Sequence, residues 1–486
     1  MGNIVRVNNK FTLRKNMLTI TWFRQDLRIS DNPALTHASK KGRVVPVYIL
    51  DNVNPGKFGL GAASKVWLHH SLEALNKDLD GHLNLYTGDP LAILKKLIET
   101  TGATSVVWNR QYEPWAQARD KKIKKTLLDA GIEADSFNGS LLWEPWSNLK
   151  DDGTPYKVFT PFYRKGCMNA PEPRNPLPKP KILDIEKRLS DCLSINDLKL
   201  IPEVRWDIDL IKSWTIGESG AKARLRNFLN TGIKNYKEGR NLPAKPFVSA
   251  LSPHLHFGEI SPNQVWNSAR KLNMDSNVDH FCSELGWREF SNSLLHHNPT
   301  LPTENLNKKF DHFPWGTDKK KLIAWQKGQT GIPFVDAGMR ELWQTGSMHN
   351  RVRMVVASFL VKNLLLDWRH GERWFWDTLF DADLANNSAS WQWVAGCGAD
   401  AAPYFRIFNP VTQGQKFDPE GEYVRKYIPE ITNLPNKFLF NPWDAPADIL
   451  DKAQVKLGDT YPNPIVSLSA SRMSALRAFE TLQGKN

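Results

Sequence analysis

The strongest constraint on the fold is a change in hydrophobic pattern partway along the 486-residue chain. Residues 17–150 alternate short runs of β-branched and apolar residues with amphipathic stretches of helical period. This alternation predicts a parallel sheet with helices on both faces. After Trp214 strand signals nearly vanish and helical periodicity dominates. We therefore expect an α/β, Rossmann-like N-terminal domain followed by a larger, all-α C-terminal domain.

The expected strands cover 18–23, 43–50, 83–88 and 105–108, with one more αβ return at 131–139, and the expected helices include 65–79, 90–102, 218–230, 261–272, 279–296 and 350–365. Prolines crowd residues 171–181, so residues 151–210 are predicted to form an extended connector between domains at 17–150 and 211–486. Residues 1–16 are polar and basic, which predicts a disordered N-terminal arm.

Composition excludes several protein classes. Apolar residues make up 41% and charged residues 24%, which is typical of a globular chain. The four cysteines include no C-x-x-C pair, which argues against a disulfide scaffold and a zinc ribbon. No apolar run reaches the length of roughly 18 residues that a membrane span requires. We therefore expect a cytoplasmic protein without a membrane partner.

Charge and tryptophan content indicate the kind of partner. The net charge of +13 favours a polyanion such as nucleic acid, although solubility alone explains it equally well. Nine of the 19 tryptophans fall between Trp287 and Trp393. A basic surface with clustered aromatic residues indicates stacking on bases or on a flat cofactor.

Two predicted helices carry the same combination of side chains on one face. Glu284, Trp287 and Arg288 follow i, i+3, i+4 spacing, and the same spacing joins Asn350, Arg353 and Met354. Each face combines an apolar side chain, a hydrogen-bonding side chain and a cationic side chain. A half-buried helix with an Arg–Glu pair explains either face alone. Two such helices in one domain favour a binding site.

Two further segments suit a charged ligand. The first places two carboxylates and two amides within seven residues, ahead of Trp391: Asp381, Asp383, Asn386 and Asn387. Two carboxylates one residue apart can bind a metal, cap a helix or pair with arginine, and the scarcity of other ligands nearby favours arginine. In the second, Ser249 and Ser252 open a predicted helix whose backbone N–H groups suit a phosphate. A plain capping turn is the alternative.

Several motifs are missing or incomplete. The chain contains no Walker A, H-E-x-x-H or G-x-S-x-G sequence, which leaves phosphoryl transfer, zinc hydrolysis and α/β-hydrolase chemistry without support. Residues 59–64, GLGAAS, begin like a dinucleotide-binding fingerprint but follow no strand and end in serine. They are predicted to form a loop and helix cap ahead of a helix at Lys65.

From about Leu18 to about Pro442 the chain resembles the photolyase/cryptochrome family of flavoproteins, and most specifically its bacterial-type enzymes for cyclobutane pyrimidine dimers. The motifs that carry the resemblance are WFRQDLRISDNPAL (22–35), LSPHLHFGEISP (251–262), ELGWREF (284–290), TGIPFVDAGMREL (330–342), TGSMHNRVRM (345–354) and WVAGCGADAAPYFRIFNP (393–410). The resemblance implies an antenna-binding α/β domain and a helical domain that holds folded FAD, active in its reduced anionic form. It also explains the missing glycine fingerprint.

The resemblance assigns cofactor contacts by position. The residues that it places at the FAD phosphates and nearby atoms are Tyr236, Ser249, Leu251 and Ser252. Those that it places around the ribose, adenine and isoalloxazine are Arg288, Arg353, Asp381 and Asp383, with an Arg353–Asp381 pair. Val248 replaces a threonine of the family pattern. Asn387 occupies the position facing flavin N5, where repair enzymes usually carry Asn and photoreceptor branches tend to carry Asp or Cys.

The resemblance also implies the substrate. Branches that repair (6-4) photoproducts show adjacent histidines where this chain has His349 and then Asn350. The pattern is similar to enzymes that act on cyclobutane pyrimidine dimers in UV-damaged DNA by light-driven electron transfer. Glu284 and Asn350 are then expected to make polar contacts with a flipped-out dimer, and Trp287 and Met354 to pack against its rings. The expected phosphate contacts are Arg240 and Arg351.

Three tryptophans, Trp391, Trp368 and Trp315, match the family's electron-transfer chain, with core packing as the alternative for each alone. The α/β domain is expected to carry an antenna chromophore. Asn109 and Glu113 resemble the folate-contacting pair of one branch, although Pro302-Thr303 stands where that branch has Cys-Lys. We favour methenyltetrahydrofolate over a deazaflavin, in a different binding mode.

Two rival functions remain. One is a cryptochrome, a signalling photoreceptor, and the other is a light-independent flavoprotein that binds nucleic acid. Asn387, both intact helix faces and a short tail after Pro442 favour repair over signalling, and the second rival leaves the three tryptophans unexplained. We expect the protein to act as a monomer.

Overall fold

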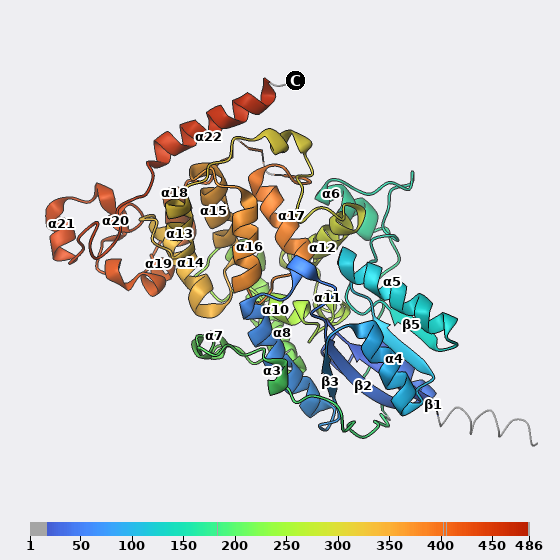
Figure 1. The fold of residues 1–486 in the computed structure, drawn as a ribbon. Helices are drawn as coiled ribbons and strands as arrows, with labels where there is room; N and C mark the ends of the chain where they lie inside the picture. Colours follow the sequence, from blue (N-terminus) through green and yellow to red (C-terminus); the bar gives the residue numbers. More distant parts are fainter. Residues whose placement is uncertain (1–16, 182, 402, 405, 485–486) are drawn as a thin grey trace, which may run out of the picture.

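The computed structural model describes residues 17–181, 183–401, 403–404 and 406–484 (Figure 1). The predicted arm at 1–16 lies outside these residues. The N-terminal part is a five-stranded parallel sheet with strand order β3-β2-β1-β4-β5. Its strands are β1 Met17–Phe23, β2 Gly42–Leu50, β3 Asn84–Thr87, β4 Ser105–Asn109 and β5 Glu133–Phe137. The predicted strands and the αβ return are therefore confirmed.

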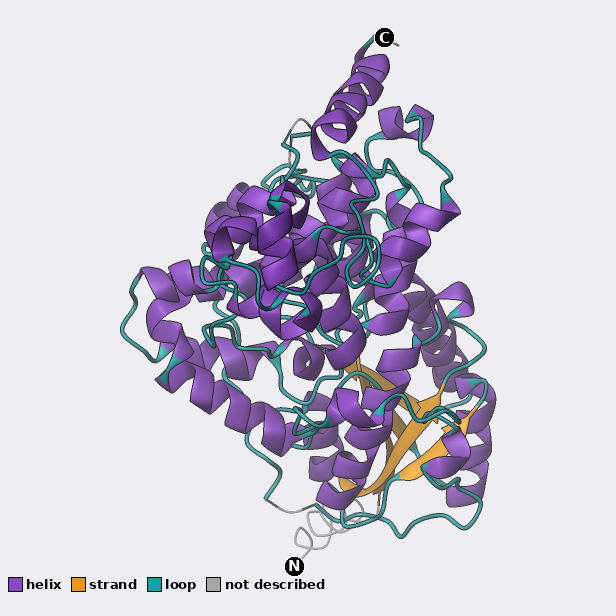
Figure 2. Ribbon diagram, turned by 90° about the vertical axis from the view of Figure 1, so that its left-hand side faces the viewer, coloured by secondary structure: helices purple, strands orange, loops and turns teal. Residues whose placement is uncertain are grey.

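Helices cover both faces of this sheet (Figure 2). They are α2 Pro33–Lys41, α3 Ala62–Asp78, α4 Pro90–Thr101 and α5 Pro114–Asp129. Neighbouring residues of one strand enter opposite layers, as strand geometry requires. Val44 packs with α2 and α3, whereas Val45 packs with α4 and α5. Burial on both faces explains the nearly continuous apolar runs of the central strands.

The rest of the chain is helical, as predicted, and all five strands end by Phe137. Its main helices are α8 Glu218–Asn230, α9 Tyr236–Gly239, α10 Ser252–His256, α11 Pro262–Arg270, α12 Ser276–His297, α13 Lys319–Gln326, α14 Pro333–Thr345, α15 Asn350–Ser358, α16 Trp368–Thr378, α17 Leu384–Ala395, α18 Pro410–Phe417, α19 Glu422–Tyr427, α20 Asn436–Leu439, α21 Ala447–Lys452 and α22 Leu468–Gln483. The predicted helix 350–365 ends early, since a wider-wound segment, η6 Phe359–Asn363, follows α15. In the described part of the chain, no helix combines the length and apolar character that membrane crossing requires.

The segment 151–210 differs from the extended connector that we predicted. Its proline-rich part, 171–181, has no regular structure, but the part that follows binds to the sheet. The Val44 N–H donates to the carbonyl of Asp184 at 2.8 Å, and the Glu186 N–H donates to the carbonyl of Val44 at 2.9 Å. Strand β3 begins too late to pair with this end of β2, so the connector satisfies its backbone instead.

Only residues 59–61 of the predicted loop at 59–64 lie outside a helix, since α3 begins at Ala62 rather than at the predicted Lys65. These residues form a docking turn between the two parts of the molecule. Helix α3 begins at Ala62, whose N–H donates to Asp377 Oδ1 at 2.9 Å. Trp376 Nε1 donates to the carbonyl of Gly59 at 2.8 Å. A Cβ on Gly61 would lie 2.1 Å from the Trp376 carbonyl oxygen, so the close approach requires glycine there.

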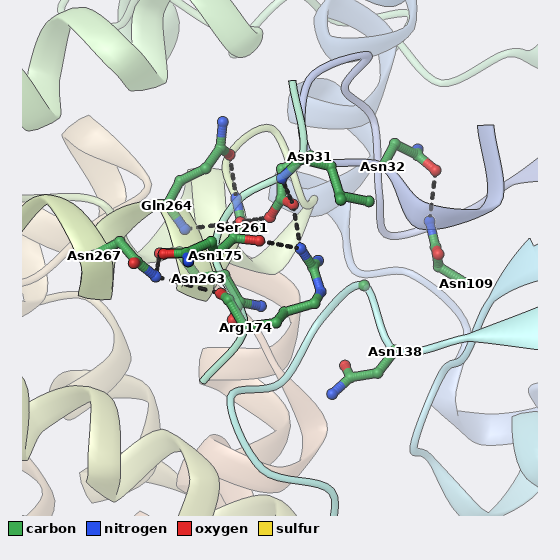
Figure 3. A network of polar contacts seen from close by, with 12 residues as sticks. Asp31, Asn32, Asn109, Asn138, Arg174, Asn175, Ser261, Asn263, Gln264 and Asn267 are labelled. Carbon is green, nitrogen blue, oxygen red and sulfur yellow. Dashed lines mark hydrogen bonds and ion pairs between the residues drawn. The ribbon is translucent and has the colours of Figure 1, made fainter. Parts of the chain in front are cut away.

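A buried polar network joins the same parts on another side (Figure 3). The Asp31 carboxylate, fully buried, accepts hydrogen bonds from Arg174, the Leu177 N–H and the Ser261 hydroxyl. Ser261 and Gln264 form the capping box of α11. One carboxylate of the α/β part thus holds both the connector and a helix of the helical part, which fixes how the two parts meet.

Candidate functional site

The α12 face that carries Glu284, Trp287 and Arg288 lies at the junction of the two parts. Trp287 stacks on Phe159 with ring centroids 3.8 Å apart and planes 11° apart, so one side of its indole is covered. Arg288 Nη1 donates to the carbonyl of Ser140 at 2.7 Å. Arg288 therefore reaches a loop of the α/β part, while Glu284, one turn earlier, binds Arg240.

Helix α15 carries the second predicted face. Arg353 Nη2 donates to both carboxylate oxygens of Asp381 at 2.9 Å, which confirms the predicted pair. The Arg353 Nε group donates to the carbonyl of Met348 at 2.8 Å, and the Asp381 side chain is 7% exposed. Asn350 is exposed and Met354 is half-buried.

The two aspartates ahead of α17 do different things. Asp381 pairs with arginine, whereas Asp383 is the N-cap of α17 and accepts from the Asn386 N–H at 2.8 Å. Within the described residues neither belongs to a group of three metal-ligand side chains. Pairing and capping, rather than metal binding, therefore account for both carboxylates.

Asn387 is buried on α17 in a defined orientation. Its Nδ2 group donates to the carbonyl of Glu372 at 3.0 Å, and no described residue donates to its Oδ1. Glu372 was not predicted from the sequence, and its carboxylate accepts from the Ser388 hydroxyl. Burial raises the pKa of Glu372 to about 7. An amide fixed through its NH₂ group can present its carbonyl oxygen to a donor.

The hydroxyl-rich turn is not used for capping. Leu251 precedes α10 without a side-chain capping bond, and no described residue binds the hydroxyls of Ser249 and Ser252. Ala250 between them adopts a left-handed backbone with φ of 49°. Tyr236, which precedes this turn in the sequence, is buried and packs on Phe281 with ring centroids 5.3 Å apart. The hydroxyls therefore remain available to a ligand.

His256 is a further candidate site residue that the sequence motifs did not single out. It is 8% exposed, and neither ring nitrogen has a hydrogen-bond partner. Burial lowers its pKa, against the opposing charges of Asp383 and Asp381. A buried imidazole without a partner costs free energy, so this group fits a ligand held between the two aspartates and Arg288. The residues present therefore fit a flavin nucleotide, which offers many hydrogen-bonding atoms. The only feature of the sequence that could have identified His256 is its position inside the motif 251–262.

The predicted phosphate ligands line the outer part of the site. Arg240 Nη1 lies 2.8 Å from His280 Nε2 and also binds Glu284. Arg351 Nη2 donates to Asn241 Oδ1 at 2.5 Å, and its guanidinium lies 4.4 Å from the centroid of Phe417. Both cations are thus braced by neighbours and face no carboxylate other than Glu284 among their described partners.

His349 lies between these arginines. Its Nδ1 accepts from the Arg351 N–H at 3.3 Å, as the N-cap of α15. Burial and the positive charges of Arg240, Arg351 and Arg353 lower the pKa of His349 to about 3. A lowered pKa favours the neutral form of the imidazole.

Comparison with known proteins identifies the family. A family model described as "DNA photolyase" matches residues 19–181, and one described as "FAD binding domain of DNA photolyase" matches residues 281–481. A deoxyribodipyrimidine photo-lyase of Agrobacterium fabrum is 49% identical over 96% of this chain and 99% of its own. The chain belongs to the photolyase/cryptochrome family.

Both branches of the photolyase/cryptochrome family occur among its relatives. Cryptochrome-2 of Arabidopsis thaliana is 38% identical, over 96% of this chain and 79% of its own. The crystal structure of a class III photolyase from Agrobacterium tumefaciens matches with a TM-score of 0.93 at 48% identity, covering 97% of this chain and 98% of that one. The predicted fold is therefore confirmed: a parallel α/β part and a helical FAD-binding domain of the photolyase type.

The three tryptophans that we predict to form an electron-transfer chain lie on neighbouring elements. Trp391 packs against Gly371, one turn beyond Trp368 on α16, so closely that a Cβ on Gly371 would lie 2.0 Å from its ring. The Gly316 N–H donates to the carbonyl of Leu365 at 2.7 Å, which places Trp315 beside the residues that lead into α16. Trp391 and Trp368 are buried, and Trp315 is half-buried.

The two residues that resemble an antenna pair are not on one cavity wall. The Asn109 amide donates to Asp26 Oδ2 at 2.6 Å and Asn32 Oδ1 at 2.8 Å, inside the α/β part (Figure 3). Glu113 instead lines a cavity with Arg288 and Asp383, and its Oε2 is buried without a partner. Burial, with the charge of Asp383, raises the pKa of Glu113.

Proposed function

We propose that this protein is a photolyase that repairs cyclobutane pyrimidine dimers in DNA when it is illuminated. The observation that carries the proposal is the orientation of Asn387. Its NH₂ group is bound to the Glu372 carbonyl, so its oxygen is free to accept a hydrogen bond. Flavin N5 carries a proton only in the reduced states, and a neutral carbonyl therefore favours reduced flavin there without adding a negative charge.

FAD, bound in its reduced anionic form, would supply the light-driven electron transfer that opens the cyclobutane bonds. The protein binds, orients and shields the reactants. In our proposal the free hydroxyls of Ser249 and Ser252 bind the phosphates, beside Leu251 and Tyr236. The Arg353–Asp381 pair, Arg288 and Asp383 hold the remainder of the cofactor, with His256 donating to it from its buried position.

The same helices offer a binding surface for the dimer. Trp287 is covered on one side by Phe159, which leaves its other side for a pyrimidine ring. Glu284 and Asn350 supply polar contacts to the base edges, and Met354 packs alongside. Asn350 follows His349 where branches that repair (6-4) photoproducts carry adjacent histidines, which agrees with dimers as the substrate.

Arg240 and Arg351 are proposed to bind the phosphates beside the lesion, in keeping with the net charge of +13. All of these residues come from one chain, so we propose that the monomer is sufficient. In the proposed division of labour, residues 211–486 hold FAD and the dimer, and residues 17–150 hold the antenna chromophore.

Trp391, Trp368 and Trp315 are proposed to carry electrons from the surface to oxidised flavin. Their positions on adjoining elements support this role, since tunnelling rates fall steeply with distance. For the antenna we propose methenyltetrahydrofolate. We do not assign Glu113 to it, because the cavity that Glu113 lines is shared with Arg288 and Asp383, which we propose to hold FAD. In our proposal Asn109 does not contact the antenna directly, because its amide is bound to other residues inside the α/β part.

The test follows the loss of thymine dimers from a UV-irradiated oligonucleotide with reduced protein, under blue light and in the dark. We expect light-dependent loss, strongly reduced by Glu284→Ala and Trp287→Ala. Trp343→Ala is the matched control, because this indole is 61% exposed and stacks on Trp374, outside the proposed site. Absence of repair, with reduced flavin verified by its spectrum, would contradict the proposal and leave a signalling cryptochrome as the leading function.

A further inference from the structure

Arg240 connects two elements that carry different parts of the proposed DNA site. It follows the short helix α9, which packs on the N-terminal half of α12. The Lys237 N–H donates to Asn277 Oδ1 at 3.0 Å, and Asn277 Nδ2 donates to the Lys234 carbonyl at 3.0 Å. These bonds fix the backbone before Arg240 relative to α12, where Glu284 lies.

Among the described residues, the guanidinium of Arg240 forms its bonds through one nitrogen, Nη1. Nη1 binds Glu284 Oε1 and lies 2.8 Å from His280 Nε2, one turn earlier on α12. Neither Nε nor Nη2 forms a bond to any described residue, and 16% of the side chain remains exposed. A planar guanidinium presents several donors in fixed directions, so one edge can hold Glu284 while the other faces a phosphate.

The Glu284 carboxylate likewise has one bonded oxygen and one oxygen without a described partner. Oε1 accepts from Arg240, whereas Oε2 accepts from no described residue, and the side chain is 28% exposed. A carboxylate accepts only, and the N3–H of a pyrimidine is a donor. With Oε1 held by Arg240, the rotation of this side chain is limited and Oε2 remains free to accept a hydrogen bond.

We propose that Arg240 is a positioning residue that couples phosphate binding to lesion recognition by holding Oε1 of Glu284 while its free edge binds the DNA backbone. This inference rests on the proposed function, because it assumes that Glu284 binds the dimer. The paired arginine also offsets the negative charge of Glu284, which would otherwise repel the phosphates of the bound strand. Arg240 therefore does more than add one positive charge.

A double-mutant cycle separates this role from simple phosphate binding. The proteins compared are the wild type, Arg240→Ala, Glu284→Ala and the double variant. For each protein, dissociation constants are measured at one salt concentration for two oligonucleotides of the same sequence, of which one contains a single thymine dimer. We expect Arg240→Ala to weaken binding of damaged DNA about 10- to 100-fold, the range for a charge-assisted hydrogen bond. Undamaged DNA should lose only about two- to fivefold. In the Glu284→Ala background, Arg240→Ala should weaken both DNAs by the same small factor.

Two further variants control for charge and folding. Arg240→Lys retains the charge without the fork, so we expect near-normal affinity for undamaged DNA but reduced preference for the dimer. Arg164→Ala removes an exposed arginine that pairs with Asp279 of α12, the helix that carries Glu284. We expect this variant to keep the wild-type preference for DNA that contains a dimer. Bound FAD absorbance verifies that each variant is folded.

Equal weakening of both DNAs by Arg240→Ala, in both backgrounds, would overturn the coupling and leave Arg240 as a phosphate contact. Retained dimer preference in Arg240→Lys would overturn it as well. A different result would contradict the proposed function itself, namely a wild-type protein that neither prefers nor repairs dimers. A wild type that repairs dimers without any Arg240–Glu284 coupling refutes only the present inference.

Discussion

Arg353 Nη2 lies 2.9 Å from each carboxylate oxygen of Asp381, a bond between the helix α15 and the segment that enters α17. It joins two residues 28 positions apart that are both assigned to the proposed flavin site. The pair holds the two helices that also carry Asn350 and Asn387. Cofactor retention, flavin chemistry and domain docking can each be tested from such contacts.

The first prediction concerns cofactor retention. Asp381→Asn removes the charge that Arg353 pairs with, and we expect the affinity for FAD to fall about 10- to 100-fold, in line with about 1.5–3 kcal/mol for a charged hydrogen bond. The flavin-to-protein absorbance ratio after dialysis measures the loss. Asp129→Asn is the control, because the Lys125–Asp129 pair lies on the exposed face of α5. Full retention of FAD in Asp381→Asn would contradict the assignment.

The second prediction concerns flavin chemistry. Asn387→Asp places a carboxylate where the amide oxygen now lies, and like charges should disfavour the anionic reduced flavin. We expect a lower flavin reduction potential and at least about tenfold slower repair. Spectroelectrochemistry of the purified protein gives the potential. Asn386→Asp adds the same charge one residue earlier, and an equal shift in that variant would show that Asn387 has no special role.

The third prediction concerns electron supply. Trp368→Phe should slow light-driven reduction of oxidised flavin at least about tenfold, while the chemically reduced variant continues to repair dimers. Transient absorption after a laser pulse measures the reduction. Trp325→Phe is matched in burial, since Trp325 is also fully buried and contacts Trp391, but it lies outside the proposed chain. If both variants slow reduction equally, a dedicated three-tryptophan path is excluded.

The fourth prediction concerns pH. Glu289 Oε2 accepts from the N–H groups of Leu142 and Trp143 at 3.0 and 3.2 Å, and burial raises its pKa to about 7. A raised folded pKa favours the protonated carboxyl, so its contribution is fully present below the unfolded value near 4.5 and is lost as pH rises through about 7. The melting temperature should therefore fall between pH 5 and pH 8, by an amount that Glu289→Gln reduces. Glu99→Gln, on the exposed side of α4, should keep the wild-type pH dependence.

The fifth prediction concerns docking of the two parts. Gly61→Ala places a Cβ 2.1 Å from the Trp376 carbonyl oxygen, and we expect a loss of about 1–3 kcal/mol in the free energy of unfolding. Gly59→Ala is the control, because its Cβ would meet only the Gly56 carbonyl at 3.7 Å. Denaturant unfolding measures both. Equal stability of the two variants would show that the turn adjusts without cost.

The elements followed from the sequence because hydrophobic periodicity records which side of each helix or strand is buried. The strand predicted at 105–108 is β4, and the helix predicted at 279–296 is α12 within three residues at its start. The connector was predicted less well. Its backbone bonds to β2 depend on where β3 begins, a relationship between distant segments that local periodicity does not contain.

The sequence alone determined the kinds of elements, their order and the residue types available for chemistry, including the likeness to flavoproteins. Only the tertiary structure decided which polar groups are paired and which are left without a partner. Glu289 binds backbone 147 residues away, and Asn109 turned out to be bound within the α/β part. His256 was missed because its two unpartnered nitrogens result from burial by many surrounding segments. Burial and pairing are collective results of packing, whereas periodicity and motifs are local.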